Sequence, residues 1–245
     1  MRFQGKKAIV TGAGKGLGRD LVKVLRAEGA EVAAVSRTET DLQSLAKEVP
    51  GISTCCVDLS DVKALQECVQ SIGCVDFLVN NAGIAICKPF LELTAEDFGK
   101  TLDVNLTAAF VATQAAAKLM KAEGRKGVIV NVSSQVSKTA VPLHAAYCAS
   151  KAGLDMLTQS SALELGPFGI RCCSVAPTVV MTDMGRANWS GEAGKPMLNA
   201  IPLGKFAEVE DVTNVVLFLL SEQAQMLTGL SVPIDGGFLA CKTLK

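Results

Sequence analysis

The sequence predicts an α/β fold in which helices cover both faces of a doubly wound parallel sheet. Short apolar runs alternate with amphipathic helical patterns along all 245 residues, which is typical of βαβ units with right-handed crossovers. The runs at 8–10 and 128–130 are continuous rather than alternating, as strands buried on both faces require. No linker-like segment or internal repeat interrupts the pattern, so a single domain, 1–245, is expected.

The elements follow one another in the order that this fold requires. Gly29 ends the first helix, and Thr94 is a suitable N-cap for the helical region after the fourth strand. Strands are expected at 8–10, 31–35, 52–57, 75–79, 128–132, 172–175 and 230–234. Helices are expected at 19–28, 38–48, 61–72, from Thr94 onward, and at 102–121, 147–165 and 211–220. Glycines and prolines interrupt 184–205, so we expect an irregular loop there that is either a substrate lid or partly disordered.

The charge balance and the cysteine pattern exclude several classes of protein. Basic and acidic residues both number 24, so the net charge is zero, which argues against a nucleic-acid or membrane-surface binder. No apolar run approaches the roughly 18 residues of a membrane span, and the N-terminus lacks the apolar stretch of a secretory signal. Nine irregularly spaced cysteines argue against a disulfide framework and favour a reducing compartment, the cytoplasm. His144 is the single histidine, so neither a metal site nor a Cys–His nucleophile pair is expected.

A glycine-rich turn joins the first strand to the first helix. Gly12, Gly16 and Gly18 are spaced so that one makes a tight turn, one allows the backbone to approach a pyrophosphate, and one lets the helix pack on the strand. The N-terminus of the helix then faces the anion. Because a strand precedes this turn and a helix follows it, the turn predicts a dinucleotide site.

The residues after the second strand indicate which dinucleotide is bound. An acidic residue there would bind the ribose 2'-hydroxyl of NAD, but the sequence has Ser36-Arg37-Thr38. A guanidinium flanked by hydroxyls suits a 2'-phosphate, and Lys15 of the glycine turn is placed to reach the same group. NADPH is therefore the expected cofactor, with Asp58, at the end of the third strand, near the adenine.

Three side chains are expected to converge beside the nicotinamide. Tyr147 and Lys151 lie one turn apart on one face of a helix. Ser134 follows a buried strand, and the carboxyl ends of strands line the ligand crevice of a doubly wound sheet. An adjacent ammonium lowers the pKa of a phenol, so Tyr147 is expected to protonate a carbonyl oxygen while Ser134 holds that oxygen.

These motifs together resemble those of the short-chain dehydrogenase/reductase family. They occur in order along almost the whole chain: Thr11-Gly12-x3-Gly16-x-Gly18, Asn80-Asn81-Ala82-Gly83, Asn105, Ser134, Tyr147-x3-Lys151 and Pro177 through Thr182. The resemblance implies a Rossmann-type sheet, with Tyr147 as the catalytic acid and Ser134 positioning the carbonyl. It also implies that Lys151 binds the nicotinamide ribose and lowers the pKa of Tyr147, and that Asn105 holds a proton-relaying water.

The same resemblance extends the expected cofactor site. The residues added are Leu17, Leu59, Asn81, Ala82, Gly83, Tyr147, Pro177, Val180 and Thr182. One departure concerns the segment beside the nicotinamide, where the family usually has Pro-Gly and this sequence has Pro177-Thr178. The contacts of Val180 and Thr182 with the carboxamide follow less directly for that reason.

Within the family, the sequence is similar to the tetrameric carbonyl reductases of animals, on the passages 10–16, 34–38, 162–167 and 202–210. That similarity implies NADPH, small α-dicarbonyl and ketose substrates such as L-xylulose, and a homotetramer. Gln135, His144 and Trp189 would line the substrate pocket, although His144 also fits a loop histidine and Trp189 also fits packing within the lid. A second helix face buried by another subunit is expected on independent grounds, because the helices 102–121 and 147–165 carry apolar residues beyond one core-facing stripe: Leu106, Ala109, Phe110, Ala116, Leu154, Met156, Leu157 and Leu163.

Two other functions remain open from the sequence. A 3-oxoacyl-carrier reductase shares every catalytic motif, but it would want a basic pocket mouth, and 184–205 contains only Arg186, Lys195 and Lys205 as basic residues. A non-catalytic NADP-binding interaction protein is the other alternative. It would have no need for the intact set of Ser134, Tyr147 and Lys151.

Overall fold

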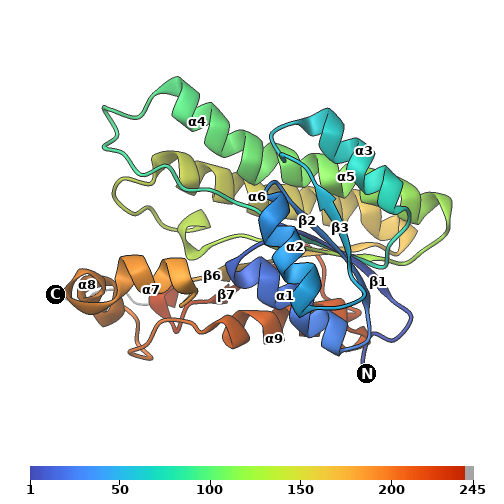
Figure 1. Cartoon of the computed structure of the whole chain (residues 1–245). Coiled ribbons are helices and arrows are strands. Elements are labelled where there is room, and N and C mark those ends of the chain that lie inside the picture. The colour runs from blue at the N-terminus through green and yellow to red at the C-terminus, as the bar shows by residue number, and fades with distance from the viewer. Residues whose placement is uncertain (241–245) are drawn as a thin grey trace.

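The computed structural model describes residues 1–240 and consists of a seven-stranded, entirely parallel sheet between two layers of helices (Figure 1). The strand order is β3-β2-β1-β4-β5-β6-β7, which reverses direction between β1 and β4 and confirms the predicted doubly wound fold. The strands are β1 (Lys7–Thr11), β2 (Glu31–Ser36), β3 (Ser53–Cys56), β4 (Phe77–Asn80), β5 (Val128–Val132), β6 (Arg171–Pro177) and β7 (Ser231–Ile234).

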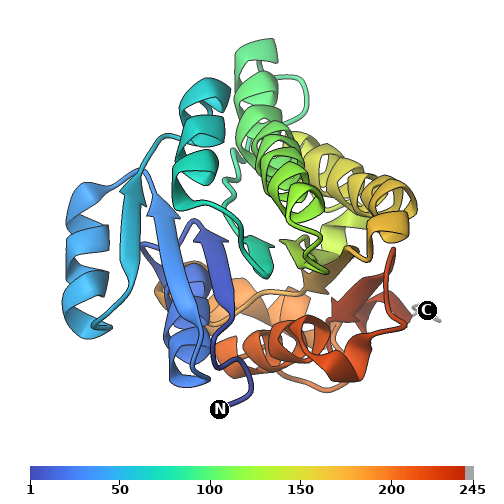
Figure 2. The ribbon, with the colours of Figure 1, turned by 90° about the vertical axis from the view of Figure 1, so that its right-hand side faces the viewer.

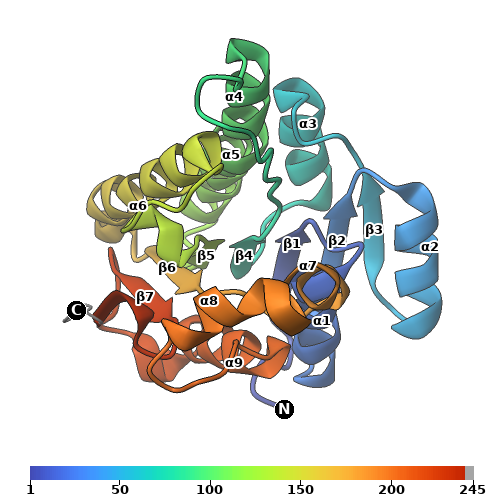
Figure 3. The ribbon, with the colours of Figure 1, turned by 90° about the vertical axis from the view of Figure 1, so that its left-hand side faces the viewer.

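Helices cover both faces of the sheet, as the end-on views show (Figures 2 and 3). One layer contains α3 (Val62–Ile72), α4 (Ala95–Leu102), α5 (Ala108–Ala122) and α6 (Ala145–Leu165). The opposite layer contains α1 (Gly16–Ala27) and α9 (Val209–Leu220), while α2 (Glu39–Glu48) lies at the β3 edge. Each layer buries its own apolar core against the sheet, with Leu21, Leu25 and Val216 on the α1 side and Leu65, Met120 and Ile129 on the α5 side.

The expected boundaries agree to within a few residues, and the larger differences fall at the ligand end of the sheet. Helix α1 begins at Gly16, inside the glycine turn, because periodicity marks only the apolar positions that follow. The expected helix 102–121 is divided by a π-helical turn, Asp103–Thr107, between α4 and α5. Such turns are frequent at functional sites.

The segment 184–205 is not the irregular loop that its glycines and prolines predict. It contains most of α7 (Asp183–Trp189), a 3-10 turn (Gly191–Gly194) and α8 (Lys195–Asn199), seen in front of the strands in Figure 3. The Thr182 hydroxyl caps α7 by accepting from the Gly185 amide at 3.2 Å, and Pro196 occupies the first turn of α8. These helices are too short for a hydrophobic period to reveal them.

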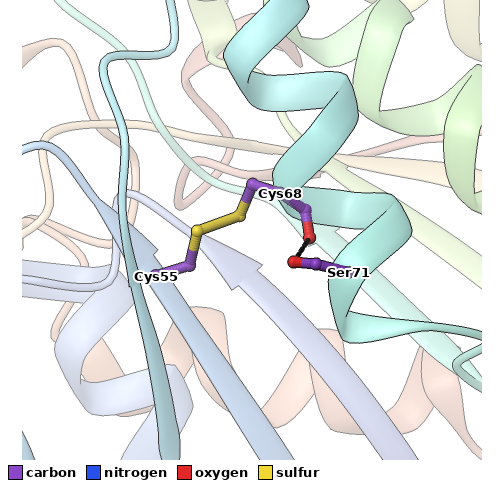
Figure 4. The surroundings of a disulfide bond; sticks show 3 residues. All are labelled: Cys55, Cys68 and Ser71. Carbon is purple, nitrogen blue, oxygen red and sulfur yellow. Dashed lines mark hydrogen bonds between the residues drawn. A yellow bond between two sulfur atoms is a disulfide. The ribbon is translucent and has the colours of Figure 1, made fainter.

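Residues 1–240 contain one disulfide bond, although the sequence argued against a disulfide framework. Cys55 of β3 and Cys68 of α3, 13 residues apart, are bonded across the strand–helix junction (Figure 4). The packing of α3 against the sheet brings their Cα atoms to 6.7 Å, a proximity that cysteine spacing alone does not show. In the described residues, no helix is long and apolar enough to cross a membrane.

Candidate active site

A cavity of about 690 Å³ opens at the carboxyl ends of the strands, a size within the range of small-molecule and cofactor sites. It lies beside the point where the strand order reverses, where ligands bind in open parallel sheets. Fourteen of the residues expected to bind the cofactor line it: Gly12, Lys15, Gly16, Leu17, Gly18, Ser36, Arg37, Thr38, Asp58, Leu59, Asn81, Ala82, Gly83 and Thr182. The sequence analysis missed the lining residues Gly14, Asp41, Ile84, Val104 and Asp183.

The glycine turn has the geometry that a dinucleotide needs. Gly12 and Gly16 have positive φ angles of 64° and 52°, a region that favours glycine. A Cβ at Gly12 would lie 2.7 Å from Ala82 Cα, and a Cβ at Gly18 would collide with the Gly12 carbonyl. The N-cap of α1, Lys15, provides no side-chain cap, so backbone amides of the first turn remain free to bind an anion. The turn therefore fits a pyrophosphate.

Opposite charges meet at the far end of the cavity. Arg37 is exposed there, and the Lys15 ammonium pairs with the Asp41 carboxylate at 3.4 Å. Hydrogen bonds from Ser60 hold the pKa of Asp58 below its usual value, with a smaller contribution from Arg37. Asp41 had no sequence signal, because only the fold of α2 brings its first turn beside the glycine turn.

The segment Asn80–Gly83 fastens three strands together beneath the cavity. Asn80 donates to the Asn131 side-chain oxygen on β5 at 2.9 Å, and Asn81 donates to the Thr11 carbonyl on β1 at 3.0 Å. The Thr11 hydroxyl in turn accepts from the Asn81 amide at 3.1 Å. These bonds fix the position of Ala82 and Gly83 in the cavity wall.

The π-helical turn places Asn105 against the same segment. Its side chain, which is 1% exposed, accepts from the Ile84 amide at 2.8 Å and donates to the Ile84 carbonyl at 2.9 Å. The same amide also donates to the Ser150 hydroxyl at 3.0 Å, which links the turn to the start of α6. Asn105 thus connects the cavity wall to the helix that carries Tyr147.

Tyr147, Ser134 and Lys151 lie together beside the cavity. The Lys151 ammonium is 5.6 Å from the Tyr147 ring centroid. The same ammonium lies 3.5 Å from the position that a Cβ at Gly83 would occupy. It donates to the Val132 carbonyl at 2.7 Å. Burial raises the pKa of Tyr147, while the neighbouring Ser134 hydroxyl lowers it in part. The phenol is therefore protonated at neutral pH, as a proton donor must be.

The expected lowering of the Tyr147 pKa by Lys151 differs from what the structure shows. Burial also lowers the pKa of Lys151 to about 8, with Asp155 acting in the opposite direction. The Lys151 ammonium is held at a backbone carbonyl and lies over the ring rather than at the phenol oxygen, so burial dominates the pKa of Tyr147.

A buried carboxylate one turn beyond Lys151 had no motif to reveal it. Asp155, 7% exposed, accepts from the Ser137 hydroxyl at 2.6 Å and from the Ser174 hydroxyl at 2.9 Å. The Lys138 ammonium lies 3.4 Å away. Asp155 therefore joins α6 to β6 and to the short 3-10 turn Gln135–Ser137 that follows Ser134.

We expect Asp155→Ala to lower the free energy of unfolding by about 2–4 kcal/mol, because two buried hydroxyls and one ammonium lose their shared acceptor. Burial raises the pKa of Asp155, but the hydrogen bonds from neighbouring hydroxyls lower it by more than burial raises it. Its net pKa is therefore below the ordinary value. The stabilisation by Asp155 is thus present above the unfolded-state pKa and is lost as the pH falls through the folded-state pKa.

Urea unfolding at several pH values measures the free energy of unfolding of Asp155→Ala and of the wild-type protein. Asp183→Ala, on the exposed start of α7, is the control. An equal effect of both substitutions at pH 7 would contradict the prediction.

The three predicted substrate residues are placed differently. Gln135 is 3% exposed and contacts the Met197 sulfur of α8 at 3.8 Å, while its side-chain oxygen has no hydrogen-bond partner among the described residues. Trp189 packs edge-on against Phe206 at 6.4 Å, which matches the lid-packing alternative. The His144 ring is 6.2 Å from the Tyr147 ring.

Both nitrogens of His144 already have partners. Nδ1 lies 2.7 Å from the Pro142 carbonyl, and Nε2 lies 3.2 Å from the Cys87 sulfur. The sequence argued against a Cys–His nucleophile pair, yet the single histidine contacts a cysteine 57 residues away. The fold brings them together through the backbone bond from the Lys88 amide to the Leu143 carbonyl, at 3.0 Å.

The remaining expected cofactor residues lie on the segment after β6. Pro177 is the last residue of β6, and Val180 forms an isolated parallel bridge with Ala207. Neither lines the cavity, whereas the Thr182 methyl lies 3.4 Å from the position of a Cβ at Gly16. This segment leads from the sheet into α7 directly above the glycine turn.

Comparison with known proteins agrees with this arrangement. The family model described as Enoyl-(Acyl carrier protein) reductase matches residues 12–239. The L-xylulose reductase of Homo sapiens is 55% identical over 238 residues, covering 97% of this chain and 98% of that protein. The chain belongs to the short-chain dehydrogenase/reductase family.

Further relatives of this short-chain dehydrogenase/reductase carry similar names. Carbonyl reductase [NADPH] 2 of Sus scrofa is 49% identical, with 98% of this chain and 99% of that protein covered. A solved structure of a putative NAD(P)-dependent gluconate 5-dehydrogenase from Beutenbergia cavernae, with bound NADP, has a TM-score of 0.92 and 33% identity, covering 98% of this chain and all of that one. The protein is thus an oxidoreductase of a family that uses nicotinamide cofactors.

Proposed function

We propose that this protein is an NADPH-dependent reductase of small carbonyl compounds, namely α-dicarbonyls and ketoses. L-Xylulose is one such ketose, and its reduction product is xylitol. The observation that carries the proposal is the half-buried, protonated Tyr147 phenol beside Ser134 and next to the cavity of the glycine turn. The names of the relatives in Homo sapiens and Sus scrofa support the same substrate class and cofactor.

In this proposal, bound NADPH supplies the hydride that reduces the carbonyl carbon. Tyr147 gives its phenolic proton to the carbonyl oxygen, and Ser134 holds that oxygen in place by a hydrogen bond. Lys151 binds the nicotinamide ribose from its position against Gly83. Asn105 holds the Ile84 backbone and Ser150 together, and the π-helical turn that carries it is where a proton-relaying water would bind.

The cofactor preference rests on Lys15 and Arg37. Both cations line the cavity together with Ser36 and Thr38. The 2'-phosphate of NADPH carries the negative charge that would pair with them. The remaining lining residues would hold the pyrophosphate along the glycine turn and the adenine between Asp58 and Leu59. Pro177, Val180 and Thr182 would then close over the nicotinamide.

The substrate class rests on polar groups beside Ser134. The unpaired, buried oxygen of Gln135 calls for a hydroxyl donor, which a ketose supplies next to its carbonyl. A substrate without a hydroxyl next to its carbonyl, such as a steroid ketone or an acyl thioester, would leave that oxygen buried and unpaired, at a cost of about 1–3 kcal/mol. The same holds for diacetyl, so Gln135 supports the ketoses, and the α-dicarbonyls rest on the family resemblance. The segment 184–205, which touches Gln135 through Met197, would serve as the lid, with Trp189 and His144 at the pocket mouth.

Steady-state kinetics with diacetyl, L-xylulose, a steroid ketone and an acetoacetyl thioester, each with NADPH and with NADH, test this function. We expect kcat/KM to be highest for diacetyl or L-xylulose with NADPH. A tenfold preference for the thioester would instead establish the 3-oxoacyl-carrier reductase, and a preference for the steroid would overturn the substrate class. Absence of any turnover, together with tight NADPH binding, would indicate the non-catalytic NADP-binding alternative.

We also propose a homotetramer. Of the apolar residues expected on a second helix face, Phe110, Met156 and Leu163 are exposed by 46%, 59% and 80%, whereas Ala109, Ala116 and Leu154 are buried in the core. A groove of about 280 Å³ between α5 and α6 continues this surface. Exposed apolar surfaces of this kind are typical of subunit contacts.

We expect Leu163→Asp to shift the protein from tetramer to smaller species at micromolar concentration, because the new carboxylate would be buried against a partner. Light scattering measures the mass. Leu91→Asp is the matched control, since Leu91 is 96% exposed but lies outside α5 and α6. A wild-type monomer would refute the assembly.

A cytoplasmic location is also proposed. It rests on the six free cysteines of the described residues, which outnumber the two joined in the Cys55–Cys68 disulfide, since unpaired thiols persist in a reducing compartment. Fractionation of cells that express the protein, followed by thiol labelling, would test it, and recovery with secreted material would refute it.

A further inference from the structure

Cys87 contacts His144, whose ring packs against that of Tyr147, and the proposed reduction gives Cys87 no role. The Cys87 residue is exposed, and its sulfur lies 3.2 Å from His144 Nε2. The Pro142 carbonyl, 2.7 Å from Nδ1, can only accept a hydrogen bond, so Nδ1 carries the ring proton. Nε2 therefore offers its lone pair to the Cys87 S–H.

The surrounding backbone holds the pair in this arrangement. Leu143, directly before His144, has a φ of 66°, a conformation that is costly for a residue with a side chain. The bond from the Lys88 amide to the Leu143 carbonyl ties this turn to the segment that carries Cys87. The Lys88 ammonium pairs with Asp97 at 2.6 Å, and His144 is the group in contact with the sulfur.

The pair is close to the reacting centre. The His144 ring packs edge-on against the Tyr147 ring at 6.2 Å. The Cys87 sulfur contacts the same imidazole at 3.2 Å, so one ring separates it from the Tyr147 ring. A small dicarbonyl that reacts at Tyr147 is therefore also close to Cys87.

We propose that Cys87 is a site of reversible covalent modification by α-dicarbonyls, which it captures as hemithioacetals with His144 as the base. The Cys87 S–H bond breaks and an S–C bond forms to one carbonyl carbon, while the C=O π electrons move to the oxygen. The proton passes from the sulfur to Nε2 of His144 and then to that oxygen. No atom or electron is gained or lost, so no oxidant or co-reactant is needed.

This proposal rests on the proposed function only for the choice of α-dicarbonyl as the ligand. A ketose carbonyl flanked by hydroxymethylene groups is a weaker electrophile than a carbonyl flanked by a second carbonyl. The adduct would block the path to Tyr147, so high concentrations of a dicarbonyl should inhibit reduction, whereas high concentrations of L-xylulose should not.

Thiol labelling without NADPH tests the pair independently of turnover. We expect iodoacetamide to alkylate Cys87 at pH 7 more than about tenfold faster than Cys56, as a gain from general-base assistance. Cys56 is the internal control, because it is also an exposed free cysteine but donates to the Arg37 carbonyl rather than to an imidazole. Burial raises the pKa of both thiols, and Glu39 adds to the effect at Cys56. His144→Phe, which keeps an aromatic ring beside Tyr147, should therefore reduce the rate at Cys87 itself toward that of Cys56.

Diacetyl tests the adduct. It should protect Cys87 but not Cys56, reversibly on dilution, and intact mass spectrometry should show addition of one diacetyl without loss of water, absent from Cys87→Ser. Equal protection by L-xylulose would mean that the ligand merely occupies the site, and it would overturn the adduct. Equal labelling of Cys87 and Cys56 would overturn the pair.

Kinetics complete the test. Cys87→Ser should retain wild-type reduction of L-xylulose and lose the inhibition at high diacetyl concentration. Inhibition that persists in Cys87→Ser would contradict the proposal. If neither compound is reduced, the proposed function fails, and the labelling and mass results still decide whether Cys87 captures dicarbonyls.

Discussion

Tyr147→Phe is expected to lower kcat for carbonyl reduction by about 10²–10⁴-fold, the contribution of a positioned general acid. The substitution removes the phenolic oxygen beside Ser134 and keeps the half-buried ring that packs against His144 and lies under Lys151. NADPH affinity should change little, because the substitution leaves the glycine turn and the cations Lys15 and Arg37 unchanged. Steady-state kinetics and a fluorescence titration with NADPH measure the two effects separately.

Lys151→Met provides the contrasting variant. The ammonium lies against Gly83 in the cavity wall, so its removal should weaken NADPH binding as well as turnover. A Tyr147→Phe protein with near-normal turnover would show that another group delivers the proton. A Lys151→Met protein with unchanged NADPH affinity would remove Lys151 from the cofactor site.

Arg37→Asp is expected to reverse the cofactor preference. Loss of one charge-assisted pair costs about 1.5–3 kcal/mol, which corresponds to roughly 10- to 100-fold weaker NADPH binding. The new carboxylate would add repulsion of the 2'-phosphate and could accept from the 2'-hydroxyl of NADH, whose binding should improve. Titration of both cofactors into wild type and variant measures the change.

The remaining cation, Lys15, and a control arginine, Arg26, make this experiment specific to Arg37. Lys15 remains in Arg37→Asp but shares its charge with Asp41, so it cannot restore the lost preference. Arg26→Gln is the control, because Arg26 contacts the Ala30 and Pro50 carbonyls and does not line the cavity. Equal use of NADPH and NADH by the wild-type protein would contradict the assignment of the phosphate site.

The sequence by itself determined the sheet, its helices and the parts of the site that local spacing encodes. Gly12 follows the first strand, and Gly16 and Gly18 open the first helix, so this glycine turn could be predicted from the strand before it and the helix after it. Tyr147 and Lys151 share a helix face because they are four residues apart, and the structure keeps them on one face of α6. Hydrophobic periodicity is a local property, and these features depend on nothing else.

Only the tertiary structure decided the contacts between residues far apart in the chain. Asn105 meets Ile84 through a π-helical turn that no sequence period marks, and Asp155 gathers hydroxyls from two other elements. Cys87 meets His144 across 57 residues, and Cys55 meets Cys68 where a helix packs on a strand. These contacts form only when helices, strands and loops pack against one another. The packing also sets the direction of each side chain, so local sequence patterns do not reveal such contacts.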